Sequence, residues 1–277
     1  MQKLYFSSYI SSQKPETIVN KQNACPFCDR DNLTGILETD GDMIWLENKY
    51  PTIQDTYQTL IVETGQCNED ITTYSNKKMR KLIRFSLEKL IHMEKDPQYK
   101  SVILYKNHGP LSGGSIKHAH MQIVGLKHAD YMESLSYENF LGIKIAENPN
   151  QAEFNLSSDP IMGFTEMNVI ISDSLEHTDL MADYIQTAVT YLTQDFSYKC
   201  TSYNLFFYHT NHHIICKIVP RFVVSPFFVG YKIPQVSVDE RLHEIKEELQ
   251  KKLNTPMKEN NVLSKTNASK FDSIKGN

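Results

Sequence analysis

Apolar positions along the first half of the chain fall into four short runs and one long periodic stripe. The short runs, at residues 43–46, 57–63 and 101–106 and from residue 120 onward, have the length and composition of strands. Residues 74–94 place apolar side chains three or four positions apart, which predicts an amphipathic helix. Its stripe consists of Met79, Leu82, Ile83, Leu87, Leu90 and Ile91. The first half therefore predicts a strand–strand–helix–strand–strand block.

The second half of the chain repeats this order of elements. Strands are predicted at 153–156 and 166–172, a helix at 179–192, and two further strands at 202–208 and 213–219. A repeated block indicates an internal duplication, so we expect an α+β protein of two similar halves.

The repeat also sets the expected boundaries. We expect an N-terminal half at residues 14–135 and a C-terminal half at 136–253, the latter ending in an amphipathic helix at 238–253. Residues 254–277 are rich in Asn, Ser and Lys and poor in apolar side chains, which predicts a disordered tail.

Composition narrows the classes of function. The 277 residues are 40% hydrophobic, as expected of a folded globular protein, and their formal charge is −4. We expect no nucleic-acid partner, because no basic run is long enough to bind one. We also expect no membrane span, because no apolar run approaches roughly 18 residues. The first residues contain no hydrophobic signal region, so a cytoplasmic protein is expected. Small anionic ligands remain possible, since they need only local positive charge.

The five cysteines form an odd number with one close pair, which in a reducing compartment favours metal binding over disulfides. Cys25 and Cys28 have the C-x-x-C spacing with which two thiolates chelate one tetrahedral zinc ion. Two buried thiols or a redox pair are the alternatives, although we see no thioredoxin-like strand-to-helix setting. His118 and Cys67 are candidates for the two further ligands. We assign the two cysteines of the C-terminal half to the core.

Residues 107–122 combine a flexible loop with side chains that can carry chemistry. The glycine-rich turn at 113–115 lets backbone N–H groups approach an anion such as phosphate. On a strand, His118, His120 and Gln122 point to the same face. A histidine beside a bound phosphate is a candidate nucleophile, so this stretch is the expected active site.

The pattern N-x5-G-G-S-x-x-H-x-H-x-Q over residues 107–122 resembles the active-site motif of the galactose-1-phosphate uridylyltransferases. These belong to the histidine-triad-like superfamily of nucleotidyl transferases. The family motif, N-x5-G-x-S-x-x-H-P-H-G-Q, has the same spacing, with Ala119 and Met121 here in place of Pro and Gly. The resemblance extends to the Cys-Pro-Phe-Cys knuckle, to Asn-Lys-Tyr-Pro at 48–51 and to Phe-Phe-Val-Gly-Tyr at 227–231. It covers about residues 14–233 and points to a bacterial branch of the family.

The resemblance implies two fused histidine-triad-like halves, each an antiparallel sheet with a packed helix, in a protein that forms a homodimer. It implies one zinc ion, with Cys67 at the position of the family's loop histidine. The implied zinc ligands are Cys25, Cys28, Cys67 and His118. The resemblance further implies that His120 is the nucleophile that carries the nucleotide. The implied phosphate and nucleotide contacts are Gln122, Ser115, Gly113, Gly114, Asn48 and Asn107.

Two positions depart from the family pattern. Many members build a second metal site on an H-x-H, where this chain has Ile215 and Lys217, so we expect no second metal. After the Val-Gly-Tyr segment the family has a glutamate that contacts the sugar, where this chain has Lys232. The sequence therefore does not specify galactose.

The predicted activity is nucleotidyl transfer between a nucleoside diphosphate sugar and a phosphorylated acceptor such as a sugar phosphate. A phosphorylase or adenylyltransferase acting on nucleoside diphosphate sugars or dinucleoside polyphosphates is the alternative. A zinc-containing nucleotide-binding protein without catalysis is a further alternative. Hydrolysis is disfavoured, because Gln122 stands where histidine-triad hydrolases have a third histidine and an amide cannot shuttle protons.

Overall fold

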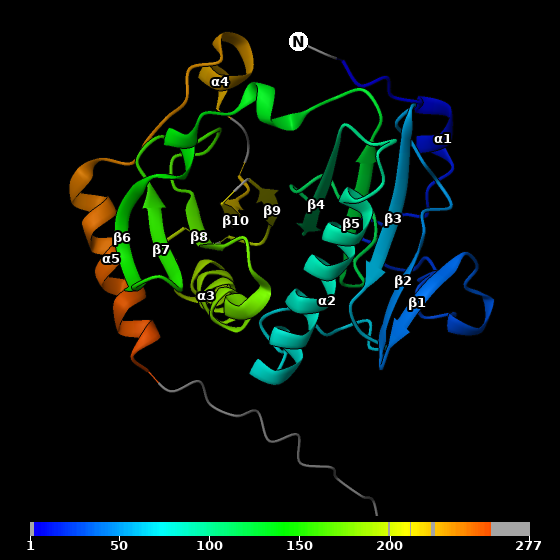
Figure 1. Cartoon of the computed structure of the whole chain (residues 1–277), viewed down its shortest axis with the longest axis horizontal. Helices are drawn as coiled ribbons and strands as arrows, with labels where there is room; N and C mark the ends of the chain where they lie inside the picture. Colours follow the sequence, from blue (N-terminus) through cyan, green and yellow to red (C-terminus); the bar gives the residue numbers. More distant parts are fainter. Residues whose placement is uncertain (1–2, 199, 211, 223–224, 256–277) are drawn as a thin grey trace, which may run out of the picture.

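Ten strands of the described residues form one antiparallel sheet. The computed structural model describes residues 3–198, 200–210, 212–222 and 225–255. Across the sheet the order is β1-β2-β3-β5-β4-β9-β10-β8-β7-β6, and neighbours run antiparallel throughout (Figure 1). The strands are β1 Ile36–Asp40, β2 Met43–Glu47, β3 Thr56–Val62, β4 Ser101–His108, β5 His120–Leu126, β6 Gly142–Asn148, β7 Ala152–Ser157, β8 Met167–Ser172, β9 Tyr203–His209 and β10 His213–Pro220.

The two halves of the sheet repeat each other. In each half three strands precede a long helix and two strands follow it. The order 1-2-3-5-4 of the first half is mirrored by 6-7-8-10-9 in the second, and the halves join where β4 pairs with β9. This arrangement confirms the predicted α+β fold of two fused halves, each an antiparallel sheet with a packed helix. The two half-sheets are continuous with each other.

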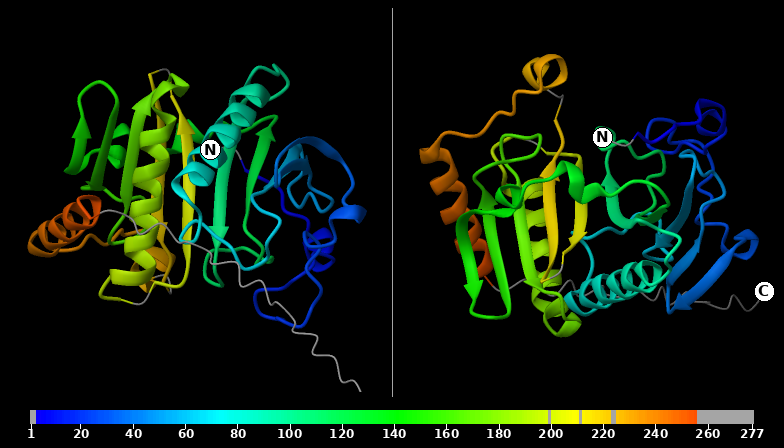
Figure 2. Two further views of the ribbon diagram at one scale, coloured as in Figure 1. Left: turned by 90° about the horizontal axis from the view of Figure 1, so that it is seen from below. Right: turned by 45° about the horizontal axis from the view of Figure 1, so that its top comes forward.

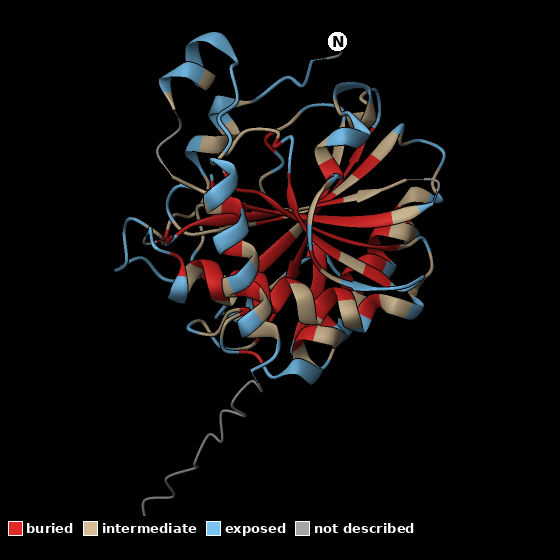
Figure 3. Cartoon of the chain, turned by 90° about the vertical axis from the view of Figure 1, so that its left-hand side faces the viewer, coloured by how far each residue is buried: buried red, intermediate tan, exposed pale blue. Residues whose placement is uncertain are grey.

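Helices α2 and α3 lie side by side on one face of the sheet (Figure 2). The α-helices are α1 Ser8–Ser12, α2 Asn76–Glu94, α3 Thr178–Thr190, α4 Pro226–Tyr231 and α5 Asp239–Leu253. The predicted stripe of α2 is buried, except that Ile91 is only partly buried against the same core. Arg80 of α2 donates two hydrogen bonds, of 2.9 and 2.6 Å, to the Asp183 carboxylate of α3. Figure 3 shows buried residues concentrated in the strands and on the helix faces that cover them. One hydrophobic core therefore spans both halves.

The N-terminal segment lies against the first half of the sheet. Phe6 forms a β-bridge with Ile53, and the Ser7 N–H donates a 2.8 Å hydrogen bond to the Thr52 carbonyl. Further along, the Thr17 N–H donates to the Ser115 carbonyl at 2.8 Å. This segment thus reaches the glycine-rich loop, which it helps to hold.

Helix α4 projects from the body of the protein (Figure 1). It begins with Pro226 after Ser225, whose hydroxyl accepts a hydrogen bond from the Phe227 N–H. Its apolar side chains face outward: Phe227 is 55%, Val229 69% and Tyr231 76% exposed.

Some elements differ from the predictions. β1 lies where we expected a polar loop, because most of its side chains are exposed and show no alternation of apolar and polar positions. β6 was not predicted for a similar reason. β4 extends to His108, so Asn107 lies on a strand that was predicted to end at Lys106.

Other expectations remain open. The predicted tail at 254–277 lies outside the described residues from 256 onward, and the boundary between 135 and 136 stays a prediction. Within the part of the chain that the structure describes, a helix with the length and hydropathy of a membrane span is absent.

Candidate functional site

Four potential metal ligands meet beside the start of β5. The Sγ atoms of Cys25, Cys28 and Cys67 and a ring nitrogen of His118 all lie within 4.8 Å of one another. Cys25 and Cys28 sit in one tight turn, in which the Cys28 N–H donates to the Cys25 carbonyl. Phe27 of that turn is buried with its ring edge-to-face against His118. The four residues expected to bind zinc thus lie together. They come from the turn, from the loop after β3 and from the residue two positions before β5, and the cluster could hold a metal ion.

The orientation of the His118 ring fits such a metal ion. Its Nε2 lies 2.8 Å from the Thr64 carbonyl oxygen, so Nε2 carries the proton and donates it. Its Nδ1 then has a lone pair, and it lies 3.6 Å from Cys25 Sγ and 3.5 Å from Cys28 Sγ. Zinc–sulfur bonds of about 2.3 Å and zinc–nitrogen bonds of about 2.0 Å in a tetrahedron separate sulfur and nitrogen by about 3.5 Å. Three thiols and one imidazole therefore form a donor set suited to zinc.

His120 is the first residue of β5 and lies against the cluster. Its Nδ1 is 2.8 Å from the His118 carbonyl oxygen and donates its proton there, so Nε2 carries the lone pair. His120 is 6% exposed, and its ring contacts the Phe27 ring. Burial lowers the pKa of His120 to about 4. His120 lines a pocket of about 340 Å³, together with Asn48, Gly113, Gly114, Ser115 and Gln122.

The loop between β4 and β5 is shaped by two glycines with positive φ. At Gly109, with φ +82°, a Cβ atom would lie 2.2 Å from the Thr201 carbonyl oxygen, so only glycine fits. At Gly113, with φ +85°, an added Cβ would meet nothing within 4 Å, which is consistent with its place in the pocket wall. Ser112 stabilises the turn by donating to the Gly109 carbonyl at 2.7 Å. The loop thus brings its backbone close to the pocket, as expected from the sequence.

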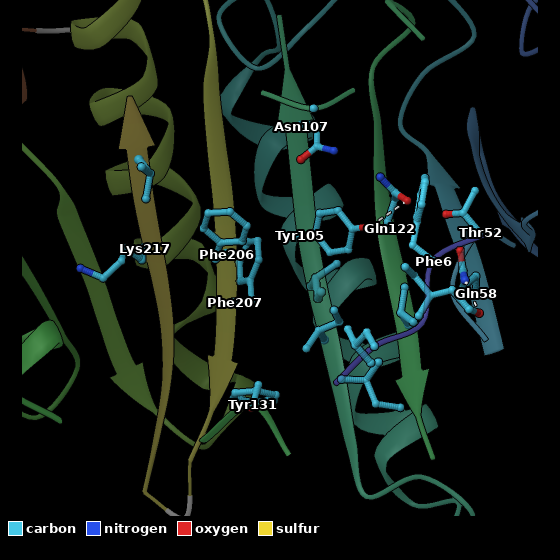
Figure 4. Close-up of a pocket in the computed structure, with 18 of the residues that line it drawn as sticks. Phe6, Thr52, Gln58, Tyr105, Asn107, Gln122, Tyr131, Phe206, Phe207 and Lys217 are labelled. Carbon is cyan, nitrogen blue, oxygen red and sulfur yellow. Dashed lines mark hydrogen bonds between the residues drawn. The ribbon is translucent and has the colours of Figure 1, made fainter. Parts of the chain in front are cut away.

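Gln122 is oriented by a neighbouring strand. Tyr105 of β4 is paired with Gln122, and its hydroxyl donates a 3.0 Å hydrogen bond to Gln122 Oε1 (Figure 4). Burial raises the pKa of Tyr105 to about 12, so the hydroxyl remains a donor at neutral pH. This hydrogen bond fixes the side chain with Oε1 toward Tyr105, and the Nε2 amide group is the donor that Gln122 can offer to a ligand.

The two asparagines expected to bind the nucleotide lie in different places. Asn48, after β2, lines the smaller pocket and accepts a 2.9 Å hydrogen bond from the Tyr50 N–H. Asn107 lines a larger pocket of about 1020 Å³. Its Oδ1 accepts a 2.6 Å hydrogen bond from Asn204 of β9.

The larger pocket extends over the middle strands of the sheet (Figure 4). It shares the wall formed by Lys14, Gly113, Ser115 and Gln122 with the smaller pocket. From that wall it continues over β4, β9 and β10, on the sheet face opposite α2 and α3. The two pockets together form one elongated site with the glycine-rich loop at its centre.

Several residues of this site were not predicted from the sequence. Lys14, for which no role was predicted, lines both pockets, and burial lowers its pKa. Tyr105 was assigned to a strand without a role. Asn204, a polar residue in an otherwise apolar strand, could have been noticed, whereas Arg221 after β10 gave no signal.

Comparison with known proteins places the chain by sequence and by fold. The family model "Domain of unknown function (DUF4931) N-terminal domain" matches residues 6–129, and the corresponding C-terminal domain model matches 132–253. The solved structure of a DUF4931 family protein from Bacillus cereus ATCC 10987 is 50% identical, with a TM-score of 0.72 over 79% of this chain and all of that one. No curated protein matches the sequence.

More distant solved structures share the fold. A uridylyltransferase is 16% identical, with a TM-score of 0.66 over 90% of this chain and 99% of that one. An ADP-glucose phosphorylase from Arabidopsis thaliana, solved with bound ADP-glucose, is 13% identical, with a TM-score of 0.65 over 90% and 98%. At these identities the likeness concerns the fold alone, which is that of uridylyltransferase-like proteins.

Proposed function

The chain belongs to the DUF4931 family, and from its site we propose that it is a nucleotidyltransferase that works through a covalent nucleotidyl-histidine. It moves a nucleoside monophosphate between a nucleoside diphosphate sugar and a phosphorylated acceptor. The observation that carries this proposal is the environment of His120. Its Nδ1 donates to a fixed carbonyl, and its ring lines the pocket that the glycine-rich loop and Gln122 also line.

In the first half-reaction, His120 Nε2 attacks the α-phosphorus of the donor. A P–N bond forms, and the P–O bond to the leaving sugar phosphate breaks with its electron pair. In the second half-reaction, an oxygen of the acceptor phosphate attacks the same phosphorus and Nε2 leaves. The proton remains bound to Nδ1 and hydrogen-bonded to the His118 carbonyl in both half-reactions, so no proton has to move to or from His120.

The loop and Gln122 stabilise the charge that the transferring phosphate carries. The N–H groups of Gly113 and Gly114, the Ser115 hydroxyl and the Gln122 amide are the donors for its oxygens. Preorganised donors of this kind are worth most in a partly dehydrated site, because they need not reorganise during the reaction. Lys14 supports them with a positive charge in the shared wall.

Cys25, Cys28, Cys67 and His118 would hold zinc, for which their donor atoms and separations are suited. Four protein ligands close such a site, so the metal would have a structural role. The His118 side chain serves the cluster while its backbone carbonyl orients His120. The cluster thereby stabilises the chain segment that positions the nucleophile.

We also propose that the protein forms a homodimer. The exposed side chains of Phe227, Val229 and Tyr231 on the projecting α4 support this, because several large apolar side chains exposed on one short helix favour a protein partner. The sugar is not specified: Lys232 follows this segment, and no sugar-contacting carboxylate stands there.

Phosphorolysis is the second candidate. It uses the same first half-reaction with inorganic phosphate as the acceptor. The fold shared with an ADP-glucose phosphorylase supports it as an alternative. The two activities differ in the acceptor that discharges the adduct.

Native mass spectrometry after exposure to UDP-, ADP- and GDP-sugars tests the proposal. We expect one donor to add the mass of its nucleoside monophosphate, on the peptide that contains His120. Binding without an adduct would support a non-catalytic nucleotide-binding protein. If no nucleotide bound, the transferase proposal would be wrong.

A further inference from the structure

Arg221 brings a positive charge from the C-terminal half into the larger pocket. It directly follows Pro220, the last residue of β10, and lines the pocket together with Asn107, Gly113 and Ser115. The C-terminal half, in which we found no catalytic motif, therefore contributes a cation to the wall that the glycine-rich loop also forms.

The Arg221 guanidinium has few partners among the described residues. Its Nη1 donates a 2.9 Å hydrogen bond to Asn204 Oδ1. Its Nε is buried without a hydrogen-bond partner, and Nη2 donates to no described residue. None of the ion pairs within the described part of the chain includes Arg221. Burial lowers its pKa, but arginine remains charged at neutral pH. A half-buried cation without a counter-ion is costly unless a ligand supplies the negative charge.

One polar bridge connects Arg221 to the active-site loop. Asn204 Oδ1 accepts the hydrogen bond from Arg221. Asn204 Nδ2 donates hydrogen bonds to Asn107 Oδ1 at 2.6 Å and to the Ser112 carbonyl at 3.0 Å. Asn204 and Asn107 lie directly opposite each other where β9 pairs with β4. The guanidinium is therefore held at a fixed position relative to the loop.

The carboxylates of this pocket are already bound to other groups. Glu16 accepts from three backbone N–H groups, those of residues 18, 19 and 20, at 2.6 to 2.7 Å. Glu166 is 2.9 Å from Lys217 Nζ and accepts from the N–H groups of residues 161, 162 and 163. Lys14 and Arg221 remain as positive charges without a described carboxylate partner. The pocket thus favours an anion.

We propose that Arg221 binds the phosphate of the acceptor. This inference rests on the proposed function. The transferred phosphate lies at the shared wall, with His120 and Asn48 on one side and Asn107 and Arg221 on the other. The sugar phosphate that leaves in the first half-reaction and the acceptor phosphate that attacks in the second occupy the same side of the transferred phosphate. In this arrangement that side is the one next to Arg221. When an acceptor oxygen attacks the nucleotidyl phosphorus, the new P–O bond forms, the P–N bond breaks, and the electron pair returns to Nε2. Arg221 neutralises the acceptor phosphate as it approaches the negatively charged oxygens of the nucleotidyl phosphate.

Discharge of the isolated adduct tests the role of Arg221. The nucleotidyl-enzyme is formed, freed of donor, and then treated with buffer alone, inorganic phosphate or glucose 1-phosphate. For Arg221→Gln we expect the ratio of phosphate-driven to water-driven discharge to fall at least about tenfold, in line with loss of a charged hydrogen bond. For Arg221→Lys, which keeps the charge, this ratio should fall less. Arg84→Gln, which removes a charge from α2 on the opposite sheet face, is the matched control. The two acceptors distinguish a free phosphate from a sugar phosphate.

A binding measurement separates this inference from the proposed function. Calorimetry with pyrophosphate, without any donor, should show a Kd about tenfold higher for Arg221→Gln than for wild type and Arg84→Gln. An unchanged discharge ratio in Arg221→Gln would overturn the inference and leave the transferase proposal intact. If the wild type formed no adduct, the proposed function would fail. The binding result would then decide whether Arg221 still forms an anion site, and an unchanged Kd would overturn that as well.

Discussion

The Nδ1 nitrogen of His120 lies 2.8 Å from the backbone carbonyl oxygen of His118. The same residue, His118, directs its own Nδ1 toward the cysteine cluster and donates from Nε2 to the Thr64 carbonyl. One residue therefore connects the candidate metal site to the candidate nucleophile. The connection fixes which nitrogen of His120 is available, because a ring that donates from Nδ1 attacks from Nε2.

The first prediction concerns His120. His120→Ala should reduce nucleotidyl transfer by at least a thousandfold and abolish the adduct, because the nucleophile is lost. Metal content and the melting temperature should stay close to wild type. His243→Ala, which removes an exposed imidazole on α5, serves as the control. An adduct of His120→Ala on another residue would show that the nucleophile was assigned wrongly.

The second prediction separates the amide of Gln122 from the hydroxyl that orients it. Gln122→Ala should slow transfer roughly a hundredfold, as expected for loss of one oxyanion donor. Tyr105→Phe removes only the hydrogen bond to Oε1 and should slow transfer less, by about tenfold, because the amide can then rotate. Single-turnover rates of adduct formation measure both effects. Equal rates for Tyr105→Phe and wild type would mean that this hydrogen bond does not orient Gln122.

The third prediction concerns the metal. Elemental analysis should find about one zinc ion per chain, bound by the cluster of three cysteines and His118. Cys67→Ala should lose or weaken zinc binding and melt at a lower temperature, because a structural metal contributes to folding free energy. Cys200→Ala, at a buried cysteine outside the cluster, should retain the metal even if it is less stable. Full zinc retention in Cys67→Ala would remove Cys67 from the ligand set, and a value near two per chain would reveal a second site.

The elements that the sequence predicted well are those with a one-sided apolar pattern. Residues 74–94 predicted a helix, and α2 runs from Asn76 to Glu94 with its stripe buried. β1 was missed, because four of its five side chains are exposed and their order carries no period. Pairing of β4 with β9 could not be foreseen either, since it depends on how two repeats meet and not on the pattern within one repeat.

The site was only partly predictable for a related reason. Cys25, Cys28, His118 and His120 lie within short motifs whose spacing indicates their chemistry, whereas Cys67 lies outside these motifs. Asn204 reaches the loop because β9 pairs with β4, which brings it opposite Asn107, 97 residues away in the chain. Arg221 is connected to the loop through its hydrogen bond to Asn204. Their roles could be inferred only from the assembled sheet. The catalytic roles of the motif residues stay predictions.

The fourth prediction concerns the buried pair of Lys217 and Glu166. Both side chains are fully buried, and Lys217 Nζ lies 2.9 Å from Glu166 Oε2 and 2.8 Å from the Asn139 carbonyl. Lys217→Met leaves the buried Glu166 carboxylate with its backbone N–H donors but without a counter-ion, and it should lower the free energy of unfolding by about 3–5 kcal/mol. The double variant Lys217→Met/Glu166→Gln removes both charges and should recover part of this loss. Urea unfolding measures both variants, and a loss below about 1 kcal/mol in the single variant would contradict the assignment of a coupled pair.

The last prediction is a pH dependence that arises where the two halves meet. His209, at the end of β9, has its Nδ1 2.6 Å from Glu94 Oε2, at the end of α2. The hydrogen bond to Glu94 raises the pKa of His209, against the opposing effect of burial, and Asp173 adds a smaller contribution in the same direction. A histidine whose pKa is higher in the folded state stabilises the protein most when it is protonated.

This contribution is therefore complete below the unfolded-state pKa of about 6.5 and disappears as the pH rises through the raised folded-state value. Glu94→Gln should lower the free energy of unfolding by about 1 kcal/mol at pH 5.5 and by clearly less at pH 9, since both side chains are about a quarter exposed. Glu88→Gln, at an exposed carboxylate of the same helix, should show no such trend. Urea unfolding of wild type and both variants between pH 5.5 and 9 provides the measurement. A Glu94→Gln effect that is constant over this range would mean that His209 does not titrate as part of the pair.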